Sequence, residues 1–305
     1  MKWRLKVACF KALSGLPGGT ALYRFSQKHL TGSLRPTEAR VSQKIVVGMQ
    51  YFDWLEKNGH SGVLIDGSHL DFGAGWHPTI PLLFYSLGVR QQYLFDLSPL
   101  LDQELIEQTV EIFLTLLRDP QWARRIQPRR LPPNVAGKVW QSYLSDLGIL
   151  YQSPYNGAWA SVKGKMDLAT STQVLLHIPR SVLADCFAQI HTCLKPGGLF
   201  LATIHLRDLV ASVQPGASKY NQLRYSNETW ETWVNSSLMS YNRLRAPDYK
   251  ELLEKAGFKV IGYDIEHGTA EDLAELERIP VASCFQRYSR EDLAAKHLFF
   301  AAQKQ

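Results

Sequence analysis

Residues 70–78 read Leu-Asp-Phe-Gly-Ala-Gly-Trp-His-Pro, and this stretch decides the fold. An apolar run with a carboxylate near its end meets two glycines spaced one residue apart, and Pro78 then opens an expected helix. Glycine lets the backbone turn tightly and pass close to a ligand. Proline suits the first turn of a helix, because an N–H would have no partner there. The stretch therefore predicts a strand, a glycine turn and a helix in succession.

A second carboxylate, Asp96, closes the next apolar run at residues 93–95. In nucleotide-like cofactor sites, a glycine turn lies under the ligand and an acidic side chain after the following strand binds the ribose hydroxyls. The two stretches together predict a site of that kind. They do not by themselves distinguish a dinucleotide from another ribose-bearing cofactor.

The chain has 305 residues, 45% of them hydrophobic, which suits one elaborated domain or two domains. No apolar run approaches the length of a membrane-spanning helix. The first residues mix cations with apolar side chains and show no clear cleavage site, so we expect no signal peptide. The four cysteines form no CxxC and no metal-ligand spacing, and we expect no metal site and a reducing, cytoplasmic location.

The net charge is +6 and the isoelectric point is about 9.0, which favours acidic partners or surfaces without naming them. Cations concentrate in the first 44 residues and again in residues 118–130. A solvated basic face is the simpler interpretation of each cluster. The basic, apolar amino terminus also suits weak peripheral contact with an anionic membrane surface.

Residues 1–62 are expected to be helical, with an amphipathic helix over 41–55. From residue 64 onward, short apolar runs alternate with helical patterns, which predicts βαβ units and a parallel sheet. Strands are expected to end near Phe72 and to span residues 93–96, 148–152, 166–171, 199–204, 259–265 and 297–302. Helices are expected over residues 78–87, 102–117, 180–194 and 246–256, with a loop or insertion over 119–133.

Residues 205–245 break this alternation. The segment is polar, rich in Trp, Tyr and Asn, and too long for an ordinary connection between two elements. We therefore expect a lid or a binding insertion there.

Four features follow one another in a fixed order: the turn at 71–75, Asp96, Asp167 at the start of the fourth expected strand, and Leu-Lys-Pro-Gly-Gly at 194–198 before the fifth. This ordered set resembles class I S-adenosylmethionine-dependent methyltransferases, over roughly residues 64–302. The stretch 73–81 together with 241–245 is similar to a narrower, little-characterised bacterial group of methyltransferases associated with polysaccharide or natural-product loci.

The resemblance implies an α/β fold with a doubly wound, mostly parallel, seven-stranded Rossmann-like sheet that closes with an antiparallel strand. It implies a helical extension over residues 1–62 and a methyltransferase domain over 63–305, with insertions at 118–147 and 205–245. Amino-terminal helices of this class often cover the mouth of the active site, which is the alternative to membrane contact for the basic terminus.

The resemblance also implies S-adenosyl-L-methionine as the cofactor and residues to hold it. The methionine part of the cofactor would be contacted by Asp71, Gly73, Ala74 and Gly75. Its ribose would be contacted by Asp96 and its adenine by Asn156. Ser171 and Gln173 would line its far side. The chain has His77 where the family often has a third glycine. That side chain either contacts the methionine carboxylate or packs against the helix.

His205 and Asp208 follow the fifth strand, at the edge of the sheet where open α/β folds bind ligands. A histidine there can remove a proton from a hydroxyl acceptor, with Asp208 orienting it. The alternative is that both residues anchor the start of the insertion. Tyr241, Arg243 and Arg245 are candidate substrate-binding residues, because arginine pairs with anionic groups. The alternative is that they clamp the insertion onto the sheet.

The sequence thus predicts an enzyme that transfers a methyl group to a small-molecule or saccharide acceptor, at a hydroxyl. A cofactor-binding protein without activity is one alternative. An NAD-dependent oxidoreductase is another, although Pro78 stands where that fingerprint needs a third glycine. Ser-Pro-Tyr-Asn at 153–156 lacks the second proline of DNA amino-methyltransferases and precedes the fourth strand, so no nucleic-acid partner is expected. The oligomeric state stays open.

Overall fold

The computed structural model describes residues 8, 11–16, 18, 34–155, 159–208, 216–236 and 240–305. Its strands are β1 (Ser68–Phe72), β2 (Gln91–Phe95), β3 (Ile149–Gln152), β4 (Met166–Thr172), β5 (Leu194–His205), β6 (Phe258–Glu266) and β7 (His297–Lys304). The longer helices are α3 (Glu38–Lys57), α4 (Thr79–Leu87), α5 (Gln103–Arg118), α9 (Arg180–Cys193) and α11 (Ala246–Lys255). Shorter helices are α6 (Pro120–Ile126), α7 (Trp140–Asp146), α8 (Trp159–Val162), α10 (Asn227–Trp233), α12 (Ala270–Glu277) and α13 (Arg290–Ala294), with single turns η2 (Ser61–Leu64), η3 (Leu175–His177), η5 (Asn221–Arg224) and η6 (Ser283–Phe285).

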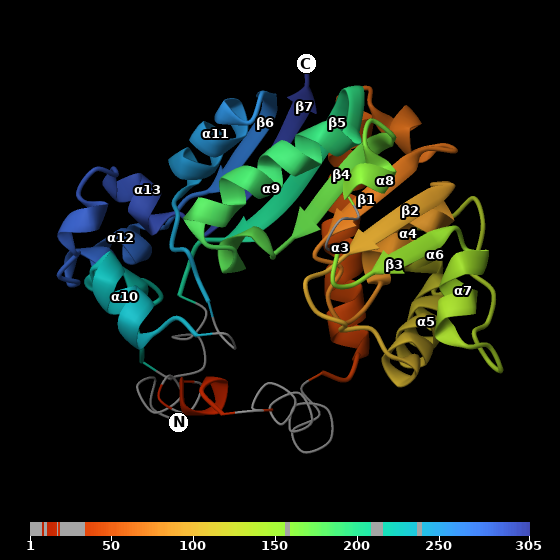
Figure 1. The fold of residues 1–305 in the computed structure, drawn as a ribbon, viewed down its shortest axis with the longest axis horizontal. Helices are drawn as coiled ribbons and strands as arrows, with labels where there is room; N and C mark the ends of the chain where they lie inside the picture. The colour runs from red at the N-terminus through yellow and green to blue at the C-terminus, as the bar shows by residue number, and fades with distance from the viewer. Residues whose placement is uncertain are drawn as a thin grey trace. The chain divides into compact units, whose positions relative to one another are not determined.

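The strands form one seven-stranded sheet in the order β3-β2-β1-β4-β5-β7-β6 (Figure 1). Strands β3, β2, β1 and β4 are parallel, with Asp71 paired with Leu94 on one side and with Thr170 on the other. The strand order reverses between β1 and β4, and open α/β sheets bind ligands at the carboxyl ends of the strands beside such a reversal. The predicted doubly wound, mostly parallel sheet is confirmed.

The sheet closes with strand β7, which runs opposite to β5. The N–H of Leu206, just beyond β5, donates to the carbonyl of Lys296 just before β7, at 2.9 Å. At the other end Lys304 Nζ donates to the carbonyl of Leu194, the first residue of β5, at 2.8 Å. The end of β6 also meets the start of β7, because the Lys296 N–H donates to the carbonyl of Glu266.

The chain divides into two compact units. The turn unit comprises Leu34–Thr172, Ala188–Leu201 and Ala302–Gln305, and contains the glycine turn. The insertion unit comprises Met1–Ser33, Gln173–Phe187 and Ala202–Ala301, and contains the long segment after β5. Strands β5 and β7 each pass from one unit to the other.

The turn unit has its own apolar core, and α3 and α4 pack closely in it. Val41, Ile45 and Met49 of α3 are buried, as the amphipathic pattern predicted. Gly48 lies between these residues, and a Cβ there would meet Leu83 of α4 at 2.5 Å. A glycine at this position is therefore what allows the two helices to approach. In the insertion unit, a separate cluster of buried residues comprises Tyr220, Leu223, Leu276, Ile279, Phe285, Leu293 and Ala294.

The structure refines one sequence prediction about local structure and contradicts another. The stretch 119–133, expected to be a loop or an insertion, contains α6, which begins with Pro120 in its first turn and with the Asp119 side chain accepting the Gln121 N–H. Both are ordinary helix-start signals. Strand β5 begins at Leu194 rather than at 199, so the Lys-Pro-Gly-Gly stretch lies within the strand and not before it.

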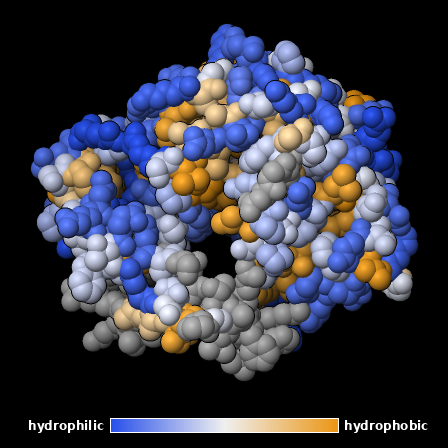
Figure 2. Space-filling model, viewed as in Figure 1, coloured by the Kyte–Doolittle hydropathy of each residue, from blue (hydrophilic) through white to orange (hydrophobic). Residues whose placement is uncertain are grey.

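Hydrophilic residues predominate on the face shown in Figure 2, and hydrophobic residues appear there as scattered patches. This distribution agrees with a chain that buries most of its large apolar side chains. In the part of the chain that the structure describes, no helix combines the length and the apolarity that a membrane crossing requires.

Candidate functional site

The glycine turn after β1 is held by backbone contacts to the end of β2. Gly73 has φ 86° and its N–H donates to the Phe95 carbonyl at 2.8 Å. Gly75 has φ 69° and its N–H donates to Asp96 Oδ2 at 2.9 Å. Positive φ angles of this size favour glycine, because other residues are strained there. The two glycines are therefore required by the backbone of the turn itself.

The turn is open to a ligand at Gly75. A Cβ built at Gly75 would meet nothing within 4 Å, whereas its neighbour Ala74 is buried. The absence of a side chain at Gly75 thus leaves free space directly against the backbone. A ligand can use that space only while the position stays a glycine.

Asp96 follows β2, and its carboxylate has a defined orientation. Oδ2 accepts the Gly75 N–H, and Oδ1 accepts the Ser98 N–H at 3.3 Å. An ionised carboxylate offers about four acceptor positions, so each oxygen can accept more than one hydrogen bond. The side chain is partly exposed at the carboxyl end of β2. It is therefore placed to accept hydrogen bonds from a diol.

Asp71 lies near the end of β1 and is buried. Its Oδ1 lies 3.2 Å from Thr170 Oγ1 on β4. Burial raises the pKa of Asp71 to about 6, although the nearby positive charge of Lys44 opposes this rise. Near neutral pH, a small change in surroundings is thus enough to change the charge of this carboxyl group.

Lys44 on α3 belongs to the site and was missed by the sequence analysis, which placed it in a basic cluster. Its Nζ donates to the His77 carbonyl at 3.0 Å, and burial lowers its pKa while the charge of Asp71 raises it. A signal was present, because Lys44 falls three residues after Val41 and four before Gly48, on the buried face of the helix.

His77 is buried, and its ring contacts the protein. Nε2 lies 2.8 Å from the Leu34 carbonyl, to which it donates as a neutral ring, because burial lowers the pKa of His77 to about 4. Of the alternatives left open by the sequence, this contact favours packing over recognition of the cofactor.

The residues expected on the far side of the cofactor are held by hydrogen bonds of their own. Ser171 Oγ donates to the Phe72 carbonyl at 2.9 Å, and Tyr51 of α3 donates to the Ser171 carbonyl. Gln173 has a positive φ of 57°, and its Oε1 accepts the His205 N–H at 2.7 Å. Asn156 lies outside the described residues.

Four aromatic residues gather where β1, β2 and β3 end, a cluster that the sequence analysis also missed. Phe72 and Phe95 end their strands, and Tyr155 and Trp159 follow β3. The Tyr155 ring is stacked on Phe95 with centroids 6.1 Å apart, and the Trp159 ring lies edge-on to Phe95 at 5.2 Å. The cluster gives the turn unit an apolar wall at the carboxyl ends of these strands.

In the insertion unit, His205 ends β5 and packs against His297 of β7, with ring centroids 3.9 Å apart. Burial, together with the neighbouring His297, lowers the pKa of His205 to about 4. The ring is therefore neutral at pH 7, and its lowered pKa makes it a weaker base than an ordinary histidine. Asp208 is buried, and its N–H donates to the Lys219 carbonyl at 2.8 Å.

Arg243 is buried and directs its guanidinium at main-chain atoms of the insertion. It donates to the carbonyls of Gln222, Tyr225 and Ser226 and to Asn227 Oδ1. Burial lowers its pKa to about 10. These contacts favour the clamping interpretation of this residue.

Arg245 has no exposed surface and also binds main-chain carbonyls. Each nitrogen of its guanidinium donates: Nε to Asp292, Nη1 to Leu206, and Nη2 to Asp292, Leu293 and Ala295. It therefore ties the end of β5 to the segment before β7. Its contacts favour clamping as well.

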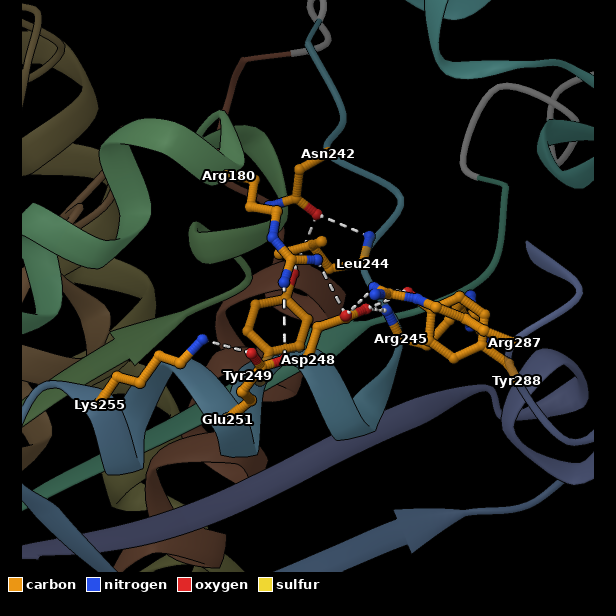
Figure 3. A network of polar contacts seen from close by, with 10 residues as sticks. All are labelled: Arg180, Asn242, Leu244, Arg245, Asp248, Tyr249, Glu251, Lys255, Arg287 and Tyr288. Carbon is orange, nitrogen blue, oxygen red and sulfur yellow. Dashed lines mark hydrogen bonds and ion pairs between the residues drawn. The ribbon is translucent and has the colours of Figure 1, made fainter. Parts of the chain in front are cut away.

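Asp248 of α11 anchors the same region (Figure 3). Its buried carboxylate accepts hydrogen bonds from Arg180, Arg287, Tyr288 and the N–H of Arg245. Figure 3 shows the side chains of Arg180 and Arg287 converging on it from different segments. The network fixes the first turn of α11 beneath the insertion.

Two cavities of the insertion unit adjoin these residues. One, of about 570 Å³, is lined mainly by polar side chains, including Arg180, Asn242 and Arg287. The other, of about 10 Å³, is lined by His205 and Tyr241 among others. Asn242, Arg243 and Leu244 line both. The structure thus brings His205, Tyr241 and Arg243 to one small cavity.

A comparison with protein families decides among the cofactor alternatives. The family described as "Methyltransferase domain" matches residues 39–262, which is most of the chain. The chain belongs to this family. With its seven-stranded sheet and glycine turn, it is a class I S-adenosylmethionine-dependent methyltransferase. No curated protein sequence matches it.

Solved structures show only a distant similarity to the methyltransferase. Magnesium protoporphyrin IX methyltransferase from Synechocystis PCC 6803, with bound S-adenosylhomocysteine, is 12% identical, with a TM-score of 0.46 over 87% of this chain and 84% of its own. An S-adenosylmethionine-dependent methyltransferase from Mesorhizobium loti is 15% identical, with a TM-score of 0.39 over 78% and 90%. Nothing about the acceptor is inferred from these similarities.

The residues of the turn unit fit the cofactor of the methyltransferase. A ribose diol needs an oriented carboxylate at the carboxyl end of a strand, and Asp96 is one. A ligand backbone passing close to the protein needs an open glycine, and Gly75 is one. Tyr155, which is partly exposed and packs on the buried Phe72 and Phe95, supplies aromatic surface near the same strand ends.

Proposed function

We propose that this methyltransferase transfers the methyl group to a hydroxyl of a small-molecule or saccharide acceptor. Bound S-adenosylmethionine supplies an electrophilic methyl group on a sulfonium. The observation that best supports the proposed cofactor contacts is the hydrogen bond from the Gly75 N–H to Asp96 Oδ2. It joins the open glycine turn to the carboxylate that is proposed to bind the ribose. Asp71, Gly73, Ala74, Ser171 and Gln173 are proposed as the other contacts, with Asn156 at the adenine.

We propose His205 as the group that accepts the hydroxyl proton. A hydroxyl is too weakly acidic to ionise at pH 7, so a nearby base assists as the new bond forms. The His205 ring is neutral at this pH and lines, with Tyr241, the small cavity of about 10 Å³, which shares Asn242, Arg243 and Leu244 with the larger one. Asp208 is proposed to hold the backbone that follows β5. The site otherwise acts through proximity and orientation of the two reactants.

The polar lining of the larger cavity supports a polar acceptor. Its volume of about 570 Å³ lies in the range of small-ligand sites. Tyr241 lines the adjoining small cavity with His205, and we propose that it contacts the acceptor from there. Arg243 and Arg245 are proposed to act by holding the insertion, because their nitrogens already donate to main-chain carbonyls.

The cofactor assignment is tested by thermal-shift titration with S-adenosylhomocysteine and with NAD, on the wild type and on Asp96→Asn. We expect S-adenosylhomocysteine alone to raise the melting temperature, and the variant to need more of it. Stabilisation by NAD and not by S-adenosylhomocysteine would overturn the proposal.

The acceptor class is tested by incubating the enzyme with methyl-labelled S-adenosylmethionine and fractions of a cell extract. Label is expected in the small-molecule or saccharide fraction, in a base-stable ether linkage. Label in nucleic acid or protein instead would contradict the proposed acceptor. Saturable binding without transfer to any fraction would favour a binding protein.

A further inference from the structure

A continuous chain of buried polar side chains crosses three neighbouring strands of the turn unit. His69 of β1 lies in the middle, with Nδ1 at 3.0 Å from Gln92 Oε1 of β2 and Nε2 at 2.8 Å from Thr170 Oγ1 of β4. Thr170 Oγ1 is in turn 3.2 Å from Asp71 Oδ1. His69, Gln92 and Thr170 have no exposed surface, and Asp71 is 4% exposed.

The amide of Gln92 has only one orientation that satisfies its surroundings. Its Nε2 donates to the Pro81 carbonyl at 2.8 Å, and a carbonyl can only accept. A flipped amide would place two oxygens against each other. Oε1 therefore faces His69, and the hydrogen between Gln92 and His69 must come from the histidine ring.

The hydrogen bonds that join Gln92, His69, Thr170 and Asp71 need one hydrogen more than these side chains carry in their ordinary protonation states. The contacts Gln92–His69, His69–Thr170 and Thr170–Asp71 each need a hydrogen. The Thr170 hydroxyl supplies one, and a neutral His69 supplies one. With an ionised Asp71, one contact would face two acceptors in a buried place, which is unfavourable. The additional hydrogen must sit on His69 or on Asp71.

The surroundings place this hydrogen on Asp71. The His69 ring packs edge-on against Phe84 of α4, with centroids 4.8 Å apart, and its other contacts are the uncharged Gln92 and Thr170. Burial lowers the pKa of His69 to about 4, so a cation is disfavoured there.

Burial and the Asp96 charge beyond β2 raise the pKa of Asp71, whereas the Lys44 charge from α3 and a hydrogen bond donated by the Thr170 hydroxyl lower it. The balance raises the pKa of Asp71 to about 6. The additional hydrogen is therefore carried more readily by the carboxyl group of Asp71 than by the ring of His69.

We propose that His69 sets the protonation of Asp71 through Thr170, and that the ammonium group of the cofactor's methionine part binds at Asp71 with release of this proton to solvent. In the free protein below about pH 6, the Asp71 hydroxyl donates to Thr170, Thr170 donates to His69 Nε2, and His69 Nδ1–H donates to Gln92; above that pH Asp71 is ionised and Thr170 donates to it. When the ammonium binds, the Asp71 O–H bond breaks and the carboxylate pairs with the cation. His69 is thus a positioning residue. This inference rests on the proposed role of Asp71 at the cofactor.

Proton release is measured by calorimetric titration of S-adenosylhomocysteine in buffers of different ionisation enthalpy. Below about pH 6 we expect about one proton released per ligand bound, with affinity falling about tenfold per pH unit, and no release well above that pH. An affinity and proton count that stay constant from pH 5 to 8 would overturn the inference.

His69→Phe keeps an aromatic ring but removes the acceptor for Thr170, which then donates to Asp71 and stabilises the carboxylate. The onset of proton release is therefore expected to move to lower pH. His69→Gln offers an acceptor and a donor, as the neutral ring does, and should restore the wild-type profile. Thr109→Val is the control, because this buried threonine bonds only within its own helix. An unmoved profile in His69→Phe would contradict the positioning role.

Histidine NMR of the ligand-free protein tests the chain separately from cofactor binding. His69 should be neutral with its proton on Nδ1 between pH 5 and 6, assigned by loss of its signal in His69→Gln. A His69 imidazolium, or a proton on Nε2, in this range would refute the proposed arrangement even if the cofactor binds. Failure of S-adenosylhomocysteine to bind at any pH would instead refute the role of Asp71 at the cofactor.

Discussion

Replacing Gly75 by alanine separates the backbone demand of the turn from the space needed by the cofactor. Gly75 has φ 69°, where an alanine costs about 1–2 kcal/mol. The new Cβ would meet no protein atom within 4 Å, so no further packing cost is expected. Gly59, in the turn after α3, provides a matched control: its φ is 74° and its Cβ space is equally open. Both variants should therefore lose about 1–2 kcal/mol of unfolding free energy in urea.

Cofactor affinity should distinguish the two variants. In Gly75→Ala, the methyl group occupies space beside the backbone that the ligand is proposed to use, and we expect S-adenosylhomocysteine to bind at least about tenfold more weakly, equivalent to about 1.4 kcal/mol. In Gly59→Ala, the affinity should stay at the wild-type value. Isothermal titration at pH 8 measures both. Equal affinities in the two variants would show that Gly75 does not face the cofactor.

Further predictions concern charge, catalysis and the clamp. Asp96→Asn should keep the Gly75 contact and weaken S-adenosylhomocysteine binding by about 10- to 100-fold in calorimetry, as expected for loss of a charged hydrogen bond; an unchanged affinity would exclude Asp96 from the ribose. His205→Ala should retain cofactor binding and lose methyl transfer in the labelled assay, and full activity would remove His205 from the mechanism. Arg245→Met leaves buried carbonyls without donors and should lower the unfolding free energy by about 2–4 kcal/mol in urea, a loss that a purely substrate-binding arginine would not cause. The pKa of Asp71 is raised from 3.8 to about 6, so its contribution to stability is fully present below about pH 4 and is lost as pH rises to just above 6. The melting temperature of Asp71→Asn relative to wild type should therefore increase from pH 4 to about 6.5 and then stay level, and a constant difference from pH 4 to 6.5 would contradict the raised pKa.

Much of the fold was predictable because its signals are local. The predicted strands ending near Phe72 and opening near Asp167 agree with β1 and β4, and Asp102 caps α5 where the pattern placed the helix start. The stretch 119–133, expected to be a loop or an insertion, contains a helix whose ordinary capping signals were obscured by composition, since arginines and prolines are typical of loops. Strand β5 begins earlier than expected, at a residue whose carbonyl accepts from the Lys304 side chain of the neighbouring strand β7, and no local pattern reveals such a contact.

The sequence predicted those site residues whose type is required by the local backbone conformation. Gly73 and Gly75 are needed for positive φ angles, and Asp96 follows directly from the end of β2. The sequence placed Arg243 and Arg245 near a ligand, or as clamps, and left the choice open. Their contacts favour clamping, because every donor group of Arg245 meets a carbonyl from a distant part of the chain.

By its order of glycines, acidic residues and strand patterns, the sequence alone determined the methyltransferase sheet, the open turn and the class of cofactor. Those features depend on backbone conformation and on the spacing of neighbours along the chain. Only the tertiary structure decided that Lys44 lies near Asp71 and that His69 reaches it through Thr170. The charge of a buried carboxyl depends on which distant residues desolvate it, donate to it or oppose it, and those partners are brought together only by folding.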